Sequence, residues 1–204
     1  MAYFPMFIEL ENKKVLVVGG GQVARRKVEK LLPYGAHITV AAPYIESSLL
    51  ALGAGRYINA PFSTDMLDDA DIVIAATDNR DLNRRISELC EKKKTPVNVV
   101  DDKALCSFIF PALIKRGEMS IGISTGGASP SAAIWAKERI NAILPAELES
   151  ILVYLESIRP IIKNLTESEA ERQSICKTLF SSCITLGRPL TDGEFASIIE
   201  EAKK

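Results

Sequence analysis

The segment Val15-Leu16-Val17-Val18-Gly19-Gly20-Gly21-Gln22-Val23-Ala24 joins an apolar, strand-like run directly to a glycine turn and the start of a helical pattern. Gly19 permits a tight turn, Gly21 lets the backbone approach a pyrophosphate, and Ala24 keeps the helix close to the strand. The helix N-terminus would present free N–H groups and a partial positive charge to the phosphates. The spacing predicts a dinucleotide-binding turn, although an ordinary strand-to-helix loop can carry the same glycines.

The flanking residues complete a β-α-β unit. Residues 14–18 are rich in β-branched side chains, which suits a strand buried on both faces. Apolar residues from Ala24 to Leu32 recur at helical spacing, and Gly35 stands where a helix C-cap would be. A second strand over His37–Ala42 follows at once. This order predicts an α/β fold with a Rossmann-type parallel sheet.

The end of this second strand is where such folds often hold the adenosine ribose. Pro43 and Tyr44 follow the strand, so no Asp or Glu stands there to accept a bond from the 2′-hydroxyl, and no Arg to bind a 2′-phosphate. The strand end alone therefore does not choose between NAD and NADP. Glu46 lies slightly beyond, either as a substitute for the missing acid or as a solvated loop carboxylate.

Composition limits the possible functions. A chain of 204 residues can bury a sizeable core, and its formal net charge of −1 argues against bulk attraction to nucleic acid or to an anionic membrane. No run of about 18 apolar residues and no signal-peptide pattern occurs. We expect a cytoplasmic protein with neither a nucleic-acid nor a membrane partner.

Cysteine and histidine usage argues against metal chemistry. The four cysteines show no C-x-x-C spacing, which favours reduced, structural thiols. His37 is the single histidine, so a histidine-based metal site is excluded by count. We expect no bound metal.

Two further strand patterns end in polar residues. Asp71–Ala76 reads as a buried strand followed by Thr77 and Asp78, which we expect on the cofactor side of the sheet. Asp78 or Asp81 could instead cap the helix that follows. Val97–Val100 reads as the next short strand.

Asp101 and Asp102 follow that strand. Asp101 would lie at the same sheet edge as the glycine turn, where a carboxylate can remove a proton from a substrate that loses a hydride. The alternative is that two acids after a strand simply form a polar turn.

The second half of the chain changes character. Ser107–Ile114 and Met119–Ser124 read as two strands joined through residues 115–118. Gly126 and Gly127 then form either a second anion-binding turn or a flexible entrance to a helix over residues 130–144, which Ser129 would cap.

From residue 146 onward the pattern is helical. A leucine-rich helix begins at Glu147 and is closed or kinked by Pro160. Two T-x-x-E capping boxes, Thr166–Glu169 and Thr191–Glu194, each predict a helix, the first ending near Gly187 and the second reaching the C-terminus.

Several of these motifs together resemble the precorrin-2 dehydrogenase and sirohydrochlorin ferrochelatase family of siroheme biosynthesis. The segments that carry the resemblance lie in the family's order over roughly the first 145 residues. They are Phe4–Phe7, Val18–Lys27, Ala75–Asp78, Asn98–Asp101, Ser107–Pro111 and Ser124–Pro130.

The resemblance implies NAD-dependent oxidation of precorrin-2 to sirohydrochlorin by a homodimer. It implies an NAD-binding Rossmann domain over 1–112, a dimerisation segment over 113–145 and a helical domain over 146–204. An alternative is a bifunctional enzyme that also inserts ferrous iron, and an alternative of another class is a non-catalytic NAD-sensing module.

The resemblance also assigns residue roles. The family's essential aspartate corresponds to Asp101, which we expect to act as the general base. The expected cofactor-binding residues are Gly19, Gly21, Gln22, Val23, Ala24, Pro43, Tyr44, Thr77 and Asp78. The expected contacts to the polycarboxylate tetrapyrrole are Ser124, Thr125, Gly126, Lys115 and Arg116.

Overall fold

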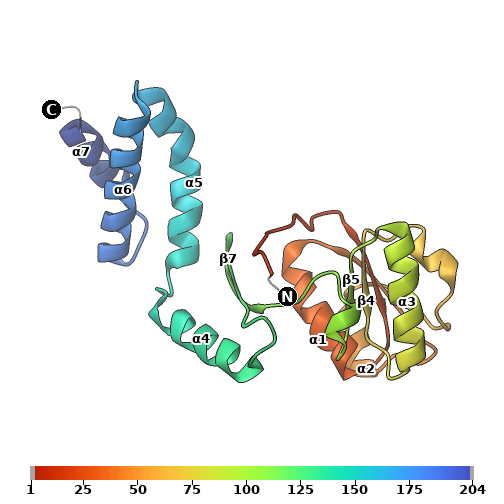
Figure 1. Cartoon of the computed structure of the whole chain (residues 1–204). Helices are drawn as coiled ribbons and strands as arrows, with labels where there is room; N and C mark the ends of the chain where they lie inside the picture. The colour runs from red at the N-terminus through yellow and green to blue at the C-terminus, as the bar shows by residue number, and fades with distance from the viewer. Residues whose placement is uncertain (1–2, 203–204) are drawn as a thin grey trace. The chain divides into compact units, whose positions relative to one another are not determined.

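A computed structural model describes residues 3–202 and divides the chain into two compact units. The N-terminal unit is Phe4–Phe110, and the C-terminal unit is Pro111–Lys204 with Met1–Tyr3. Figure 1 shows the elements of both.

The N-terminal unit contains one parallel sheet of five strands in the order β3-β2-β1-β4-β5. The strands are β1 (Lys14–Val18), β2 (His37–Ala41), β3 (Gly55–Ile58), β4 (Ile72–Ala75) and β5 (Val97–Val99). Strand β1 lies in the centre and pairs with β2 on one side and with β4 on the other. The carboxyl ends of all five strands therefore meet at one edge of the sheet.

Helices cover both faces of this sheet. They are α1 (Gln22–Leu31), α2 (Ser47–Leu50) and α3 (Arg80–Lys93), with short 3-10 turns η1 (Leu32–Tyr34), η2 (Thr64–Leu67) and η3 (Lys103–Leu105). Each face of the sheet has its own apolar core, and alternate residues of β1 contribute to each. Val15 and Val17 pack in the core shared with α1, whereas Leu16 and Val18 pack in the core shared with α3. This alternation confirms the predicted Rossmann-type α/β fold.

The C-terminal unit begins with an antiparallel hairpin and continues as helices. Strands β6 (Ala112–Arg116) and β7 (Met119–Ile123) are followed by α4 (Pro130–Ile143), α5 (Leu148–Leu165), α6 (Glu169–Leu186) and α7 (Asp192–Ala202). Buried residues of α5, α6 and α7 form one apolar core that includes Ile151, Leu179 and Ile199. The helical tail is as predicted; residues 203 and 204, to which the last helix was expected to extend, lie outside the described residues.

The strand predicted over Ser107–Ile114 is wrong in its first half. Strand β6 starts only at Ala112, and the residues before it are tied to β5 partly through side chains. Ser107 Oγ accepts a bond from the Val97 N–H at 2.7 Å, and the Asn98 amide donates to the Phe108 carbonyl at 3.0 Å. Residues 107–111 therefore pack beside β5 without forming a regular ladder of backbone hydrogen bonds with it.

Two predicted helix boundaries also need correction. Of the two alternatives for Pro160, closure of the helix is wrong: α5 continues to Leu165, with Ile158 and Ile162 buried in the helical core on either side of the proline. The cap of α6 is Ser168, whose hydroxyl accepts from the Glu171 N–H. The predicted cap thus stood two residues before the observed one, and the Glu171 carboxylate accepts from the Glu167 N–H at 3.2 Å.

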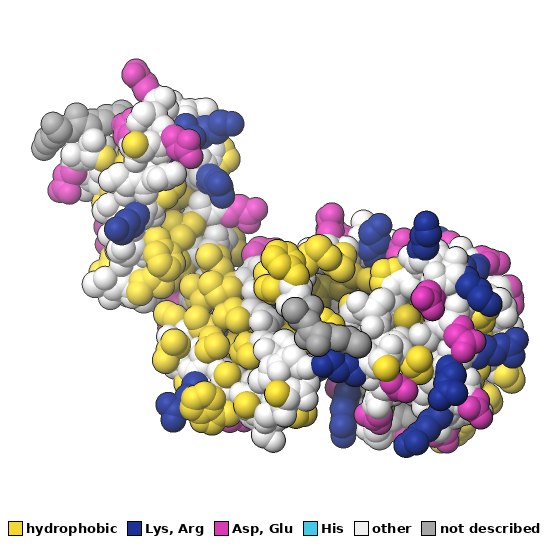
Figure 2. All heavy atoms as spheres, viewed as in Figure 1, with side chains coloured by type: hydrophobic (Ala, Val, Ile, Leu, Met, Phe, Trp, Pro, Cys, Tyr) yellow, Lys and Arg dark blue, Asp and Glu magenta, His cyan; other side chains and the backbone are white. Residues whose placement is uncertain are grey.

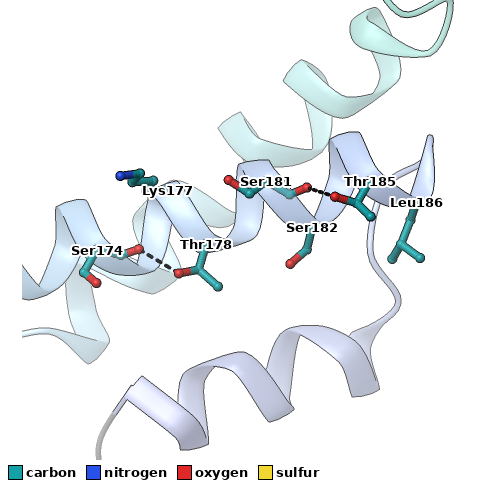
Figure 3. A pocket seen from close by; sticks show the side chains of 7 residues that line it. All are labelled: Ser174, Lys177, Thr178, Ser181, Ser182, Thr185 and Leu186. Carbon is teal, nitrogen blue, oxygen red and sulfur yellow. Dashed lines mark hydrogen bonds between the residues drawn. The ribbon is translucent and has the colours of Figure 1, made fainter.

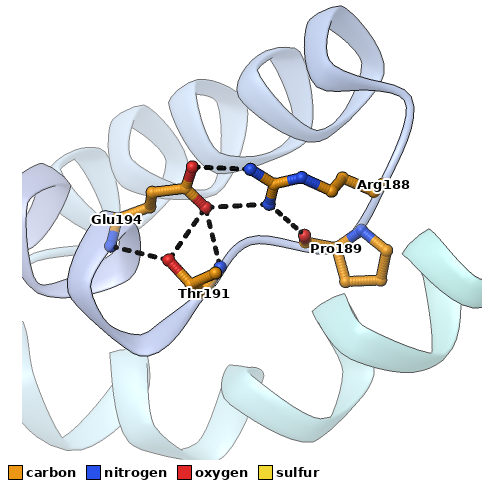
Figure 4. Close-up of polar contacts among 4 residues, drawn as sticks. All are labelled: Arg188, Pro189, Thr191 and Glu194. Atoms are coloured by element: carbon orange, nitrogen blue, oxygen red, sulfur yellow. Dashed lines mark hydrogen bonds and ion pairs between the residues drawn. The ribbon is translucent and has the colours of Figure 1, made fainter.

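The second predicted capping box is confirmed. The Glu194 carboxylate accepts from the Thr191 N–H at 2.8 Å, and the Thr191 hydroxyl accepts from the Glu194 N–H at 3.4 Å. Arg188 adds two hydrogen bonds to the same carboxylate, at 2.8 and 2.9 Å (Figure 4). These bonds, above all those from Arg188, lower the pKa of Glu194 to about 2.

Candidate nucleotide-binding and active site

Gly19 follows β1 and lies between the ends of β2 and β4, the strands on either side of β1. Its N–H donates to the Ala41 carbonyl at 2.9 Å, and its φ of 133° is a conformation that side chains disfavour. A Cβ at this position would lie 2.2 Å from the Ala76 carbonyl oxygen. The turn after β1 therefore requires glycine here, as the sequence predicted.

The next two glycines differ in their surroundings. A Cβ on Gly20 would lie 2.0 Å from the Tyr44 carbonyl oxygen, so this residue is required for packing against the loop after β2. A Cβ on Gly21 would meet only the Glu46 carboxylate, at 3.5 Å. Gly21 is thus less crowded than Gly19 and Gly20, because it meets no backbone atom there. Sequence reasoning gave Gly20 no role, because its neighbour across the turn comes from a distant loop.

The N-terminus of α1 has no side-chain cap. Gly21 is the N-cap residue and the first turn holds no acidic side chain. The first N–H groups of the helix, including those of Gln22 and Val23, therefore lack side-chain acceptors and can bind an anion. Ala24 is fully buried and keeps α1 against the sheet. The cradle at Gly21 and this uncapped terminus fit a dinucleotide pyrophosphate.

The loop after β2 borders this turn. Pro43 and Tyr44 are exposed, with Tyr44 76% accessible. Glu46 is not a freely solvated carboxylate: the Gln22 side-chain amide donates to it, and the Ser48 hydroxyl lies 3.4 Å from the same oxygen. The structure therefore brings Gln22, the first residue of α1, together with the loop that follows β2.

At the end of β4, Thr77 is engaged in a local network. Its hydroxyl donates to Asn83 at 2.7 Å, and the Asn83 amide donates back to the Thr77 carbonyl. Asn79 caps α3 by accepting from the Leu82 N–H at 3.0 Å, so the alternative in which Asp78 or Asp81 caps this helix is wrong. Asp78 remains exposed at the sheet edge.

Asp101 lies just past β5, at the same edge of the sheet as Gly19. The Val100 N–H still donates to the Ala75 carbonyl at 2.9 Å, so the chain leaves the sheet at Asp101 itself. Asp101 is exposed and has a φ of 60°, a left-handed conformation. Asp102 takes the turn role, because its carboxylate accepts from the Ala104 N–H and caps η3. Of the two acids, Asp102 is thus the one that forms the turn.

Lys27 is a residue of this region that sequence reasoning missed. Its ammonium donates to the buried Asn98 amide oxygen at 3.0 Å and lies 4.1 Å from the centre of the Phe110 ring. Burial lowers the pKa of Lys27 to about 8, with Lys30 acting in the same direction, while Cys106 and Asp101 oppose the shift. In the sequence this lysine is indistinguishable from its basic neighbours on α1.

The predicted substrate residues all lie in the C-terminal unit. Thr125 folds its own loop, because its hydroxyl donates to the Ser129 carbonyl and accepts from the Ser129 N–H. Ser124 accepts from the Gly126 N–H at 3.1 Å. Lys115 donates to the Gly117 carbonyl, and Arg116 donates to Asn141 of α4 at 2.9 Å. Lys115 therefore bonds within the hairpin, and Arg116 links the hairpin to α4.

Other features of the described residues do not point to a second reactive site. Within residues 3–202, no three His, Cys, Asp or Glu side chains gather as metal ligands, and the four cysteines are unpaired. A pocket beside α6 is lined mainly by serines and threonines, and the hydroxyls of Thr178 and Thr185 bond to carbonyls of their own helix (Figure 3). Across the same part of the chain, no helix has the length and apolar character needed to cross a membrane.

Comparison with known proteins agrees with the Rossmann geometry. The chain is 38% identical over 184 residues to a siroheme synthase of Actinobacillus succinogenes, covering 89% of this chain and 39% of that protein. It is 36% identical over 203 residues to a siroheme synthase of Neisseria meningitidis serogroup C, covering 98% of this chain and 40% of that protein. The chain therefore spans about two fifths of the length of these relatives.

A solved structure has the same fold over its whole length. It is described as SirC, precorrin-2 dehydrogenase, with a TM-score of 0.74 and 23% sequence identity, and the match covers 98% of this chain and 99% of that one. The family model NAD_binding_7, described as NAD(P)-binding, matches residues 6–112. This range contains the complete parallel sheet and the glycine turn, and the chain belongs to this NAD(P)-binding family.

Proposed function

We propose that the protein oxidises precorrin-2 to sirohydrochlorin with NAD, as a step in siroheme biosynthesis. The observation that carries the proposal is the place of Asp101, at the carboxyl end of the sheet that also bears the glycine turn. In parallel sheets this edge is where ligands bind. A module that only sensed NAD would need no carboxylate there.

Different residues of the N-terminal unit bind the nucleotide and accept the proton in such a reaction. NAD supplies the hydride acceptor when it is bound. The N-terminus of α1 holds the pyrophosphate, with Gln22 and Val23 beside it. Asp101 accepts the proton that the tetrapyrrole loses together with the hydride.

The substrate class is supported by the relatives, several of which are named siroheme synthases and one of which is named a precorrin-2 dehydrogenase. A tetrapyrrole with many carboxylates requires cations, and Lys115 and Arg116 are the proposed ones. Ser124, Thr125 and Gly126 are the further proposed contacts in the C-terminal unit, and they follow β7 at the opposite end of the hairpin from Arg116. Additional insertion of ferrous iron is not favoured by any observation over oxidation alone.

The decisive experiment replaces Asp101 with Asn. Asparagine tolerates the left-handed conformation of this residue, so we expect the fold and NADH binding to be unchanged. NADH formation from NAD and precorrin-2 should be abolished, as followed by absorbance. Asp102→Asn is the matched control, because Asn also caps helices, and it should keep its activity. Turnover by the Asp101 variant would contradict the proposed base, and nucleotide binding without turnover by the unsubstituted protein would favour the sensing module.

We further propose a cytoplasmic homodimer that pairs through a dimerisation segment over residues 113–145, between domains over 1–112 and 146–204. The hairpin of this segment has only two strands, which is too little for a stable sheet without further packing. Helix α4 beside it leaves Trp135 59% exposed and Ile143 79% exposed. Figure 2 shows hydrophobic side chains gathered over α4 and the adjoining part of α5. An apolar surface of this kind supports pairing with a second copy.

A further inference from the structure

The position of Glu46 bears on which dinucleotide the N-terminal unit accepts. Glu46 lies five residues beyond the end of β2, outside the strand end at which the ribose-binding acid usually stands. The fold nevertheless returns its carboxylate to the glycine turn, because Oε1 lies 3.5 Å from the position of a Cβ on Gly21.

Backbone contacts fix the loop that carries this carboxylate. The Glu46 N–H donates to the Gly20 carbonyl at 2.9 Å, and the absence of a side chain on Gly20 allows the Tyr44 carbonyl to pack against it. The side chain is held in turn by the amide of Gln22, which also donates to the Ser48 hydroxyl at 3.3 Å. Hydrogen bonds therefore hold both the backbone and the side chain of Glu46 in place.

The chemistry of this position distinguishes two dinucleotides. With the pyrophosphate at the N-terminus of α1, the adenosine ribose lies between the glycine turn and the loop after β2. A carboxylate there accepts a hydrogen bond from a free 2′-hydroxyl and repels a 2′-phosphate. The guanidinium of Arg25, on the first turns of α1, is paired with Glu29 at 2.7 Å.

We propose that Glu46 selects NAD over NADP by binding the adenosine ribose, in place of the acid that the end of β2 lacks. The inference rests on the proposed use of a dinucleotide, but it does not depend on the tetrapyrrole reaction. It makes Gln22 a positioning residue for this carboxylate, since the Gln22 amide bonds to Glu46 from the first position of α1.

The test measures dissociation constants of NADH and NADPH by fluorescence titration of the purified full chain, without tetrapyrrole. The unsubstituted protein should prefer NADH. Glu46→Gln should weaken NADH binding about tenfold, as expected for the loss of a hydrogen bond to a charged group, and should strengthen NADPH binding. Glu46→Asp keeps the charge and should still reject NADPH. Glu88→Gln, which removes an exposed carboxylate from α3, is the matched control and should change neither constant.

The results separate this inference from the proposed reaction. An unchanged NADH to NADPH ratio in Glu46→Gln, with a native circular dichroism spectrum, overturns the role of Glu46 even if precorrin-2 is still oxidised. A preference of the unsubstituted protein for NADPH overturns it as well, and leaves an NADP-dependent dehydrogenase. Failure to bind either nucleotide would overturn both proposals.

Discussion

Two adjacent glycines of the nucleotide turn should respond differently to the same substitution. In Gly20→Ala the new Cβ would lie 2.0 Å from the Tyr44 carbonyl oxygen, where ordinary contact begins at 3.4 Å. The loop after β2 must therefore move by more than 1 Å. Overpacking of this kind costs about 1–3 kcal/mol. Strain on the bond from the Glu46 N–H to the Gly20 carbonyl adds about 0.5–1.5 kcal/mol. We expect the free energy of unfolding to fall by about 1.5–4.5 kcal/mol.

Gly21→Ala should leave the fold nearly intact. Its Cβ would meet a single flexible carboxylate at 3.5 Å, and its φ of −97° is open to any residue. The poorer N-cap preference of alanine limits the loss to about 1 kcal/mol. The methyl group would instead occupy the space through which the backbone approaches the pyrophosphate, so NADH binding should weaken.

Hydrogen exchange measured by mass spectrometry on peptides from β1 and β2 reports the stability of the N-terminal unit separately from the C-terminal unit. Fluorescence titration with NADH supplies the binding constant. Equal exchange in Gly20→Ala and in the unsubstituted protein would refute the steric reasoning. A Gly21→Ala variant that loses as much stability as Gly20→Ala, or that binds NADH normally, would refute the division of roles.

Two further predictions concern charge and assembly. Because the pKa of Lys27 is about 8 in the folded chain and 10.5 when unperturbed, the unfolded chain binds more protons between these values, and stability from this group rises with pH across that window. Lys27→Met should remove this rise in the free energy of unfolding, measured from urea-unfolding curves at several pH values. The same pH dependence in both proteins would contradict the contribution assigned to Lys27. Trp135→Glu places a charge on the exposed apolar surface of α4 and should convert a dimer into a folded monomer in sedimentation velocity. A monomeric unsubstituted protein would contradict the proposed dimer.

The sequence predicted those parts of the fold in which local pattern and tertiary packing agree. Strand β1 was found because a β-branched run suits a strand buried on both faces, and the C-cap at Gly35 because glycine adopts the left-handed conformation readily. Strand β3 was not found, since Gly55 and Arg56 begin it and it is only partly buried at the edge of the sheet. Its pairing with β2 is set by tertiary structure and leaves little trace in hydropathy.

The candidate site was predictable only as far as its backbone. The glycines and the strand ends place Thr77 and Asp101 on one edge of the sheet without any knowledge of side chains. The contacts of Glu46 with Gln22 and of Lys27 with Asn98 join residues that are far apart in the chain. In the sequence Glu46 and Lys27 cannot be told apart from ordinary surface charges, because their burial and their partners are determined only by the folded arrangement.

The contacts of Gly19 have a consequence for the order in which the protein folds. The Gly19 N–H donates to the carbonyl of Ala41, the last residue of β2, while the Ala76 carbonyl, just past β4, lies where a Cβ on Gly19 would be. A nascent chain that ended before β2 would carry the whole glycine motif but would lack the Ala41 carbonyl that accepts from the Gly19 N–H. Nucleotide affinity should therefore arise only after β1 and β2 have paired, although the glycine motif is synthesised before β2.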